Sequence, residues 1–387
     1  MGVASYLAAA TPPRLAVGGV TVAIPVLAVE QTGDVALGGL LAAATLAPSI
    51  LAAPFAGALL DRSRRPGALI AGAGIAMATA YAVAAFLGPI PAWIVALVLL
   101  AGGAAMPFVM GGLSSYVTEG IPDERRAYAI DALAYNLGSV AGPAMVAAAV
   151  ALGSARAATL LVAASAVAGA LGTIPLRLRP AASPPRVSMW RTMARGIRHI
   201  ALHRPLAVIT TSGTLSQFGA GGLSIAAIAL SVARTGDPGQ GALVVTAFAI
   251  GGLLGALWNS GHPSRFRPEA TMGWGFAATG VLTVVAAVDL GLWWTMAAIG
   301  ASGLFTAPSS SAMLLIRKQQ SPPALRSQVF TVGAGLRAAA AAFGAAVAGL
   351  ASGLGASALL ALIGATWIAS AALLLAYPRD ARPVDGT

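Results

Sequence analysis

The sequence contains two related copies of one segment, and this repeat limits the possible folds more than any other feature. Residues 14–34 read RLAVGGVTVAIPVLAVEQTGD, and residues 217–237, 203 positions later, read QFGAGGLSIAAIALSVARTGD. A second match at an offset of 200 pairs IPDERR at 121–126 with SPPALR at 321–326. The chain of 387 residues is therefore expected to consist of two similar halves of about 200 residues each.

The composition predicts that both halves lie in a membrane. Hydrophobic residues make up 58% of the chain, charged residues 9%, and the mean hydropathy is +0.83. Soluble domains have roughly 45–50% apolar and about 25% charged residues. Apolar runs long enough to cross about 30 Å of hydrocarbon recur along the whole chain. We therefore expect an all-α membrane protein with the lipid bilayer as its solvent.

The apolar runs predict about twelve membrane-spanning helices, six in each half. They are expected at 3–30, 35–60, 67–88, 91–118, 128–150, 156–177, 205–233, 239–260, 269–288, 292–316, 327–351 and 355–377. The first run lacks the basic region and cleavage site of a removable signal peptide, so it is expected to remain. The predicted domains are a bundle at 1–177, a linker at 178–204, and a bundle with a short tail at 205–387.

The positive charges predict the orientation in the membrane. With this set of helices, 19 of the 23 Lys and Arg residues lie in connections on one side, and only Arg156 and Arg234 lie on the other. Positively charged loops resist translocation, so the first side is expected to be cytoplasmic. Both termini would then be cytoplasmic, in the cell's inner membrane. The net charge of +11 thus reflects topology, and nucleic acid is not expected as a partner.

The predicted linker contains an amphipathic helix. Met189, Met193, Ile197 and Ile200 recur at helical spacing, while three arginines occupy the opposite face. Such a helix is expected to lie on the inner membrane surface. A tether between the two halves is the simpler interpretation, and a regulatory or partner-binding helix is the alternative.

The segment GALLDRSRRP at 57–66 connects the second and third predicted helices. It resembles the signature loop of the major facilitator superfamily, because Gly57, Asp61, Arg62 and Arg65 match the pattern of that family. Arg64 stands where the family has a glycine. The resemblance implies twelve helices in two pseudo-symmetric bundles of six, and secondary transport by rocking-switch alternating access.

The resemblance also implies that this loop is a conformational latch. The Asp61 carboxylate could lie against the positive N-terminal end of the helix predicted at 327–351. Arg62 and Arg65 would pair with nearby acids. The second copy has Ser264 at the position of Asp61, so the latch is expected in one half only. The alternative role of the arginines is to set the topology.

The helix predicted at 128–150 contains Gly138, Gly142 and Pro143, which partly match the glycine-proline motif of antiporters in this superfamily. Small residues four positions apart also permit close helix packing, which is the simpler interpretation. The same spacing occurs at Gly251 and Gly255, and at Gly349 and Gly353.

Charged and polar residues at membrane depth are candidates for substrate binding. Arg337 lies eleven residues beyond Arg326, roughly 16 Å into the bilayer. Arg14 lies at a similar depth, after a Thr-Pro-Pro sequence that is expected to break its helix. Intramembrane arginines are costly and often functional. The predicted substrate-binding residues are Arg14, Asn136, Gln217 and Arg337. The alternatives are an interfacial Arg14 and a structural Arg337.

Acidic residues are scarce, which bears on both the cargo and the coupling ion. Glu30 and Asp131 are the candidates for proton coupling, with a role as interface charges as the alternative. Because the predicted midplane contains arginines and no carboxylate, the cargo is expected to be anionic, zwitterionic or amphipathic. The three histidines, at 199, 203 and 262, lie in or beside connections and are not expected to relay protons.

The sequence thus predicts a transporter and not an enzyme. No metal-ligand cluster, nucleophile turn or phosphate-binding glycine loop is evident, and no cofactor or metal is expected. The run from Thr32 to Arg62 resembles bacterial drug and metabolite exporters. The leading hypothesis is a monomeric, proton-coupled exporter of small organic molecules. The alternatives are an uptake or exchange carrier for an organic anion, and a non-transporting membrane sensor or lipid-moving protein.

Overall fold

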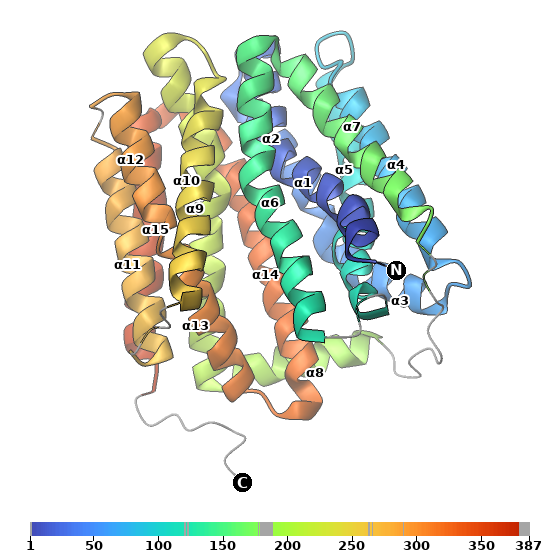
Figure 1. Cartoon of the computed structure of the whole chain (residues 1–387). Coiled ribbons are helices and arrows are strands. Elements are labelled where there is room, and N and C mark those ends of the chain that lie inside the picture. The colour runs from blue at the N-terminus through green and yellow to red at the C-terminus, as the bar shows by residue number, and fades with distance from the viewer. Residues whose placement is uncertain are drawn as a thin grey trace. The chain divides into compact units, whose positions relative to one another are not determined.

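The computed structural model shows a helical protein (Figure 1). It describes residues 2–119, 121, 124–176, 178, 189–261, 264, 266–288 and 290–378. Nearly all of these residues lie in helices or the short turns that join them. The expectation of an all-α protein is confirmed.

The chain divides into two compact units. The first contains Met1–Arg186 and Ser231–Thr246, and the second contains Val187–Leu230 and Ala247–Thr387. This division resembles the predicted halves, although the segment 231–246 groups with the first unit. The predicted domain boundaries at 177 and 204 stay a prediction.

The first half of the chain forms helices in the order expected from the apolar runs. They are α1 (Val3–Thr32), α2 (Val35–Leu46), α3 (Pro48–Arg62), α4 (Pro66–Ala84), α5 (Ala92–Pro107), the π-helix η1 (Phe108–Gly112), the short η2 (Val117–Glu119), α6 (Glu124–Leu152) and α7 (Ala155–Thr173). A bend at Ala47, followed by Pro48, divides the second predicted span into α2 and α3.

The second half repeats this order after one additional helix. Its elements are α8 (Met189–Leu202), α9 (Arg204–Thr235), α10 (Gln240–Gly261), α11 (Pro268–Ala286), α12 (Leu292–Gly303), α13 (Thr306–Gln319), α14 (Pro323–Leu350), η3 (Ser352–Leu354), α15 (Ala356–Leu373) and η4 (Leu374–Ala376). The tenth predicted span again consists of two helices, α12 and α13.

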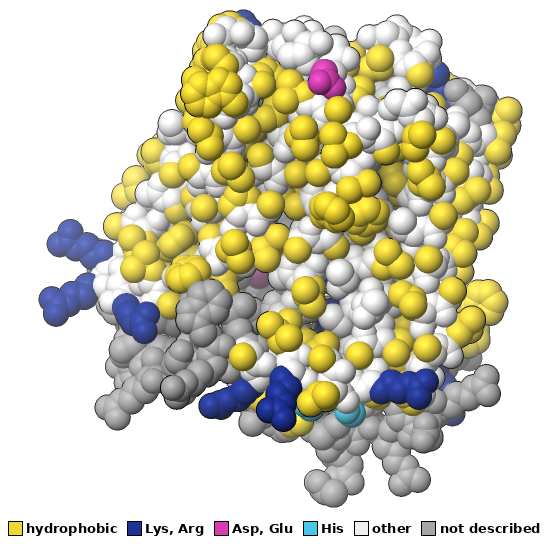
Figure 2. Space-filling model, turned by 180° about the vertical axis from the view of Figure 1, so that it is seen from behind, with side chains coloured by type: hydrophobic (Ala, Val, Ile, Leu, Met, Phe, Trp, Pro, Cys, Tyr) yellow, Lys and Arg dark blue, Asp and Glu magenta, His cyan; other side chains and the backbone are white. Residues whose placement is uncertain are grey.

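Among the described residues, 11 helical segments are long and apolar enough to cross a membrane. The ninth predicted span, at 269–288, is not among them and corresponds to α11, whose 19 residues begin with Pro268 and Glu269. Because its first turn is polar, α11 is less hydrophobic than the 11 segments. Hydrophobic side chains cover the visible face of the molecule in Figure 2. Their exposure fits a surface solvated by lipid tails.

Helix α1 is enclosed by its neighbours in the first unit and packs against both α6 and α7. It is continuous from Val3 to Thr32 and contains Pro12, Pro13 and Pro25. The break expected at the Thr-Pro-Pro sequence is therefore wrong. Neighbouring helices can hold a proline-containing membrane helix in place, which propensity alone does not reveal.

Glycines bring the paired helices of each half into close contact. A Cβ added to Gly18 would collide with the carbonyl oxygen of Gly138, and Gly142 lies against the backbone of Gly19. In the second half, a Cβ on Gly221 would collide with the carbonyl oxygen of Ala341. The repeated Gly-Gly pair thus serves one packing role in both copies. Gly353 differs, since nothing lies within 4 Å of a Cβ built there.

The Thr-Gly-Asp end of the repeat forms the same turn twice. Gly33 and Gly236 have φ angles of 71° and 73°, a left-handed conformation that favours glycine. The carboxylate of Asp34 then accepts hydrogen bonds from the backbone N–H groups of Ala36 and Leu37 and caps α2. In both copies, the Thr-Gly-Asp sequence therefore marks the end of one helix and the start of the next.

The predicted linker contains α8, a helix at Met189–Leu202. Ile200 is buried, and Gly196 lies against Gln328 of α14. Ile197, expected on the same apolar face, is 51% exposed. The linker residues at 179–188 and the tail at 379–387 lie outside the described residues.

Replacement of Gly18 by alanine is expected to destabilise the protein. The added methyl group would force α1 and α6 apart, and overpacking costs about 1–3 kcal/mol. Thermal unfolding of the purified protein measures this change. Gly72→Ala in α4 is the matched control, because nothing lies within 4 Å of its added Cβ. Equal unfolding temperatures for the two variants would contradict the assigned role of Gly18.

Candidate functional site

Arg14 lies within the first unit on the buried side of α1, and only 2% of it is exposed. The facing surface of α6 presents Asp131, Tyr135 and Gly138, which are spaced four and three residues apart and therefore share one helix face. Gly138 lies directly against the backbone of Arg14. The absence of a side chain at 138 lets the two helices approach closely enough for the residues beside it to meet.

The guanidinium of Arg14 is held by three types of contact. Nη2 forms an ion pair with Oδ1 of Asp131 and donates a hydrogen bond of 2.8 Å to Oγ of Ser114. The hydroxyl group of Tyr6 donates a hydrogen bond to the same carboxylate oxygen. The ring of Tyr135 lies below the cation, with Cζ 3.9 Å from its centroid. A buried positive charge is thus matched by a carboxylate and an aromatic face.

The ion pair does not satisfy every donor of Arg14. Within the described part of the chain, Nε and Nη1 of Arg14 have no hydrogen-bond partner. The Asp131 side chain is 13% exposed. Without the negative charge of Asp131, Arg14 would be a buried cation with free donors, and another anionic group could take the place of that carboxylate.

The second unit contains Arg337 of α14, which is partly buried. Beside it lies Arg317 of α13, which is only 1% exposed. The sequence analysis counted Arg317 among the charges of a cytoplasmic connection, whereas the structure places it in the last turn of α13 with its side chain buried. Its burial could have been suspected from the apolar run that precedes it, but the polar Arg-Lys-Gln-Gln sequence at the end of that run suggested a loop.

The remaining predicted substrate-binding residues lie on α6 and α9. Asn136 is exposed on α6, beside Tyr135, and Gln217 is partly buried on α9. Glu30, a candidate for proton coupling, is exposed at the end of α1. Its Oε2 accepts a hydrogen bond of 2.9 Å from the backbone N–H of Ala155 at the start of α7. This contact gives Glu30 a structural role at a helix N-terminus. The functional roles of these residues stay predictions.

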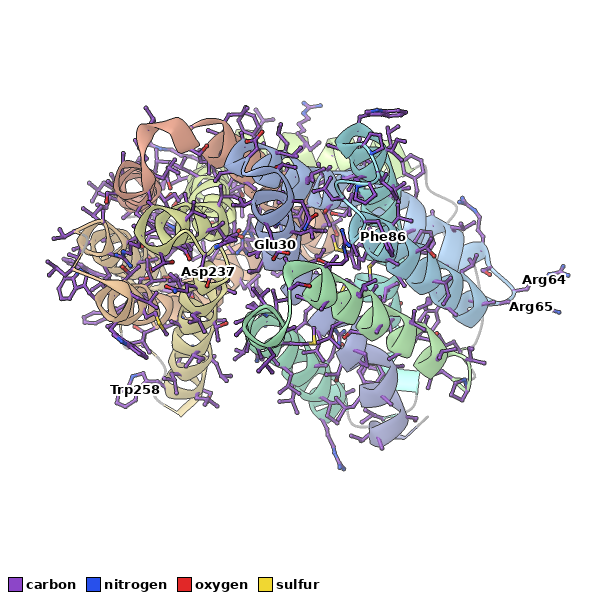
Figure 3. The ribbon with its side chains drawn as sticks, turned by 90° about the horizontal axis from the view of Figure 1, so that it is seen from above. Glu30, Arg64, Arg65, Phe86, Asp237 and Trp258 are labelled. Carbon is purple, nitrogen blue, oxygen red and sulfur yellow. The ribbon has the colours of Figure 1, made fainter. Side chains whose placement is uncertain are left out.

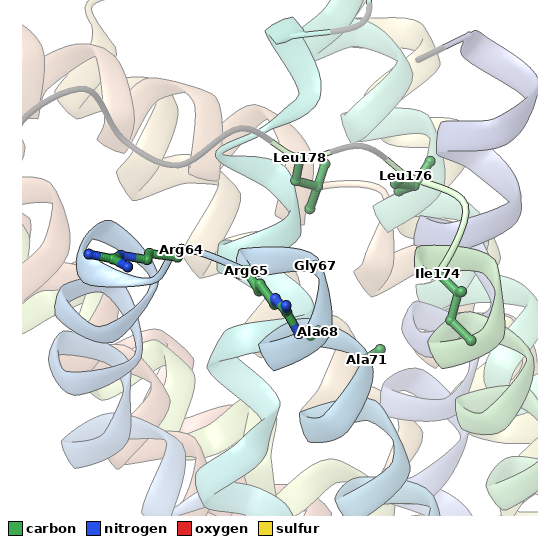
Figure 4. Close-up of a pocket in the computed structure, with 8 residues that line it drawn as sticks. All are labelled: Arg64, Arg65, Gly67, Ala68, Ala71, Ile174, Leu176 and Leu178. Atoms are coloured by element: carbon green, nitrogen blue, oxygen red, sulfur yellow. The ribbon is translucent and has the colours of Figure 1, made fainter.

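The predicted latch lies at the end of α3. Gly57, Arg62 and Arg65 are exposed, and Asp61 belongs to the helix, but its side chain lies outside the described residues. Arg64 and Arg65 project outward in Figure 3. Both also line a pocket of about 470 Å³ beside the end of α7, together with Gly67, Ala68, Ala71, Ile174, Leu176 and Leu178 (Figure 4). The latch itself stays a prediction.

Two histidines lie at the junction of α8 and α9. The rings of His199 and His203 stack with centroids 5.5 Å apart. Nε2 of His203 lies 3.0 Å from Oε1 of Gln320. Burial, followed by the nearby His203, lowers the pKa of His199. Helix α8 is not among the membrane-spanning segments, which agrees with the prediction that these histidines lie in a connection.

Asp131→Asn is expected to destabilise the protein strongly. The substitution removes the negative charge that neutralises Arg14, and breaking a buried ion pair in this way costs about 3–5 kcal/mol. Unfolding of the purified protein measures the loss. Adding Arg14→Gln should recover part of it, because the unpaired cation is then also removed. Two additive losses in this double-mutant cycle would contradict coupling between the residues.

Acidification is expected to destabilise the junction of α8 and α9 through His199. Its pKa in the folded protein lies below the unfolded value. The stabilising contribution of the neutral ring is therefore complete above about pH 6.5 and is lost as the pH falls through the folded pKa. Unfolding temperatures at neutral and acidic pH measure this effect. The decrease should be smaller in His199→Gln, and an equal decrease would exclude His199 as the cause.

Three solved structures resemble the whole chain. The nucleoside transporter NupG has a TM-score of 0.79 at 14% sequence identity, with 97% of this chain and 100% of that chain covered. A peptide transporter POT has a TM-score of 0.73 at 15% identity, with 97% and 93% covered. A POT family transporter in complex with 5-aminolevulinic acid has a TM-score of 0.71 at 11% identity, with 96% and 95% covered. These similarities show the fold.

Sequence comparisons identify the family. The Major Facilitator Superfamily model matches residues 14–225. The uncharacterized MFS-type transporter y4rN of Sinorhizobium fredii is 28% identical over 398 residues, which cover 99% of this chain and 96% of that protein. The predicted fold of two pseudo-symmetric bundles of six helices is thus confirmed. The chain is a multi-pass membrane protein that belongs to the major facilitator superfamily, a family of secondary transporters.

Proposed function

We propose that this protein couples the movement of a small organic anion to the movement of protons by rocking-switch alternating access. The observation that carries the proposal is the buried ion pair between Arg14 and Asp131. A buried ion pair contributes little net stability compared with apolar packing. Its presence at the closest contact of α1 and α6 is therefore better explained by a role in transport.

The mechanism follows from competition for one guanidinium. When Asp131 is ionised, it occupies Arg14. When Asp131 takes up a proton, Arg14 can bind the anionic group of a substrate through its free donors. An anion that displaces the carboxylate likewise raises the affinity of Asp131 for a proton, because the nearby cation is then neutralised. Proton and anion thus promote each other's binding, and this reciprocity is required by linkage.

This linkage favours uptake of an organic anion. Because proton and substrate bind together, an inward proton gradient would drive the substrate inward. That direction corresponds to the alternative hypothesis drawn from the sequence, not to the leading one. The exporter hypothesis is the second candidate, and it is favoured by the resemblance of residues 32–62 to bacterial exporters. It requires a zwitterionic or amphipathic substrate whose positive group competes with the proton for Asp131.

The other predicted residues complete the proposal. Arg337 is proposed to bind the anionic group in the second unit, and Asn136 and Gln217 to supply polar contacts. Between the two acids, Asp131 is the better candidate for proton coupling, because Glu30 already accepts a backbone hydrogen bond. Gly57, Asp61, Arg62 and Arg65 are proposed to form the latch. The protein is proposed to act as a monomer in the inner membrane, with both termini cytoplasmic and without a cofactor.

Proteoliposomes loaded with a pH-sensitive dye test the proposal. Addition of organic acids from the outside should acidify the lumen when a substrate enters with protons. Asp131→Asn should abolish this acidification while exchange of labelled substrate across the membrane continues. Glu30→Gln is the matched control, because it also removes one carboxylate from the first unit, at the end of α1, but should leave the acidification intact.

The same assay separates the two candidate directions. An inward proton gradient should accelerate accumulation of the substrate if proton and anion move together. Faster loss of preloaded substrate under this gradient would instead support the exporter. If proteoliposomes with Asp131→Asn acidify as fast as those with the wild type, the ion pair has no role in proton coupling, whichever way the substrate moves.

A further inference from the structure

The second unit contains a pair of arginines whose arrangement differs from that of Arg14. Arg317 belongs to α13 and Arg337 to α14, and these helices are in contact. The guanidinium of Arg317 lies against Gly333, one turn before Arg337. A Cβ built on Gly333 would lie 2.6 Å from Cζ and Nη2 of Arg317 and 2.8 Å from Nη1. Glycine at 333 therefore leaves the space that the guanidinium occupies.

The donors of this pair are not satisfied by the described residues. Nε and Nη2 of Arg317 and Nε of Arg337 are buried and have no hydrogen-bond partner there. Arg317 is 1% exposed, so bulk water cannot replace such a partner. Both positive charges lie on the same side of α14, because Gly333, which the Arg317 guanidinium contacts, is one helical turn before Arg337. In the first unit, by contrast, Asp131 neutralises Arg14.

Two unpaired cations side by side are a costly arrangement in a buried site. An isolated buried ion is destabilising even after the protein relaxes. Each unsatisfied buried donor adds to this cost. An anion between the two guanidinium groups would remove both costs, because each planar group can donate two parallel hydrogen bonds to an oxyanion. The pair is therefore suited to a ligand and poorly suited to a purely structural role.

We propose that Arg317 and Arg337 together bind an oxyanion that carries about two negative charges, either a phosphate-type group or a dicarboxylate. The matching of two positive charges by two negative charges favours this class over a monocarboxylate. The proposal rests on the proposed role of Arg337 in binding an anion, and it adds Arg317 as the second donor. It narrows the substrate class from organic anions in general to dianionic oxyanions.

The test is a binding measurement on the purified full-length protein in detergent, without any proton gradient. The probes are inorganic phosphate, succinate and acetate at constant ionic strength. Phosphate or succinate should raise the unfolding temperature in a saturable way, and acetate should have a much smaller effect. Isothermal titration calorimetry with the stabilising probe gives the affinity. Arg317→Gln and Arg337→Gln should each weaken binding at least tenfold.

Arg267→Gln is the matched control, since this arginine belongs to the same unit but is 73% exposed and lies near Glu269. It should leave both the affinity and the stabilisation unchanged. Without any probe, Arg317→Gln should unfold at the same or a higher temperature than the wild type, because a buried repulsion has been removed. If Arg317 were only structural, Arg317→Gln would unfold at a lower temperature than the wild type. The probes would then stabilise Arg317→Gln as much as they stabilise the wild type.

Four further outcomes decide the proposal. The proposal would be overturned if Arg317→Gln bound phosphate or succinate with wild-type affinity. It would also be overturned if no probe stabilised the wild-type protein saturably, in detergent or in nanodiscs. If Arg317→Gln does not fold, Arg317→Lys keeps the charge without the planar fork and should bind more weakly than the wild type. Stabilisation by nanodiscs of phosphatidic acid, whose phosphomonoester can carry two negative charges, but not by the soluble probes, would identify a lipid phosphate as the oxyanion.

The binding assay and the transport assay can fail independently. Anion binding by Arg317 and Arg337 in detergent involves neither Asp131 nor a gradient, so the loss of proton coupling in proteoliposomes leaves the binding result intact. Conversely, proton-coupled transport that persists in Arg317→Gln would leave the coupling proposal standing and would reject the second arginine as a substrate ligand.

Discussion

The close contact between α1 and α6 determines what the first unit can do in a membrane. Gly18, Gly19, Gly138 and Gly142 bring the two backbones together. At this distance Arg14 can reach Asp131, and its charge is neutralised inside a helix bundle where water could not do so. Without the glycines, the same arginine would be an unpaired charge in hydrocarbon. The packing of small residues and the placement of a buried charge are therefore one arrangement.

The two halves use the same packing but place charges differently. In the second half, Gly221 and Gly344 bring α9 and α14 together, as the glycines of α1 and α6 do in the first. No carboxylate stands at the position that corresponds to Asp131, because that residue is Thr331. The second half instead carries Arg317 and Arg337 without a neutralising acid among the described residues. The same helix packing thus carries an arginine neutralised by Asp131 in the first half, and two arginines with unsatisfied donors in the second half.

Much of the fold could be predicted from the sequence, because apolar runs of spanning length and a repeat with fixed spacing depend on local composition. The Thr-Gly-Asp end of the repeat is an example, since Gly33 and Gly236 adopt the same left-handed conformation in both copies. The site was predictable only in part. Depth along a helix pointed to Arg14 and Arg337, and Asp131 was identified as a rare acid. That Arg14 and Asp131 meet was not predicted, because partners 117 residues apart leave no periodic signal.

The sequence by itself determined the membrane class, the order of the apolar segments, the twofold repeat and the resemblance to the family. These properties follow from hydrophobicity, length and spacing, which any contiguous stretch reveals. Only the tertiary structure decided that α1 passes unbroken through three prolines, that Arg317 is buried, and that one arginine is neutralised while two are not. Neighbouring helices set these outcomes, because the energy of a charge or a proline in a membrane depends on the groups packed around it.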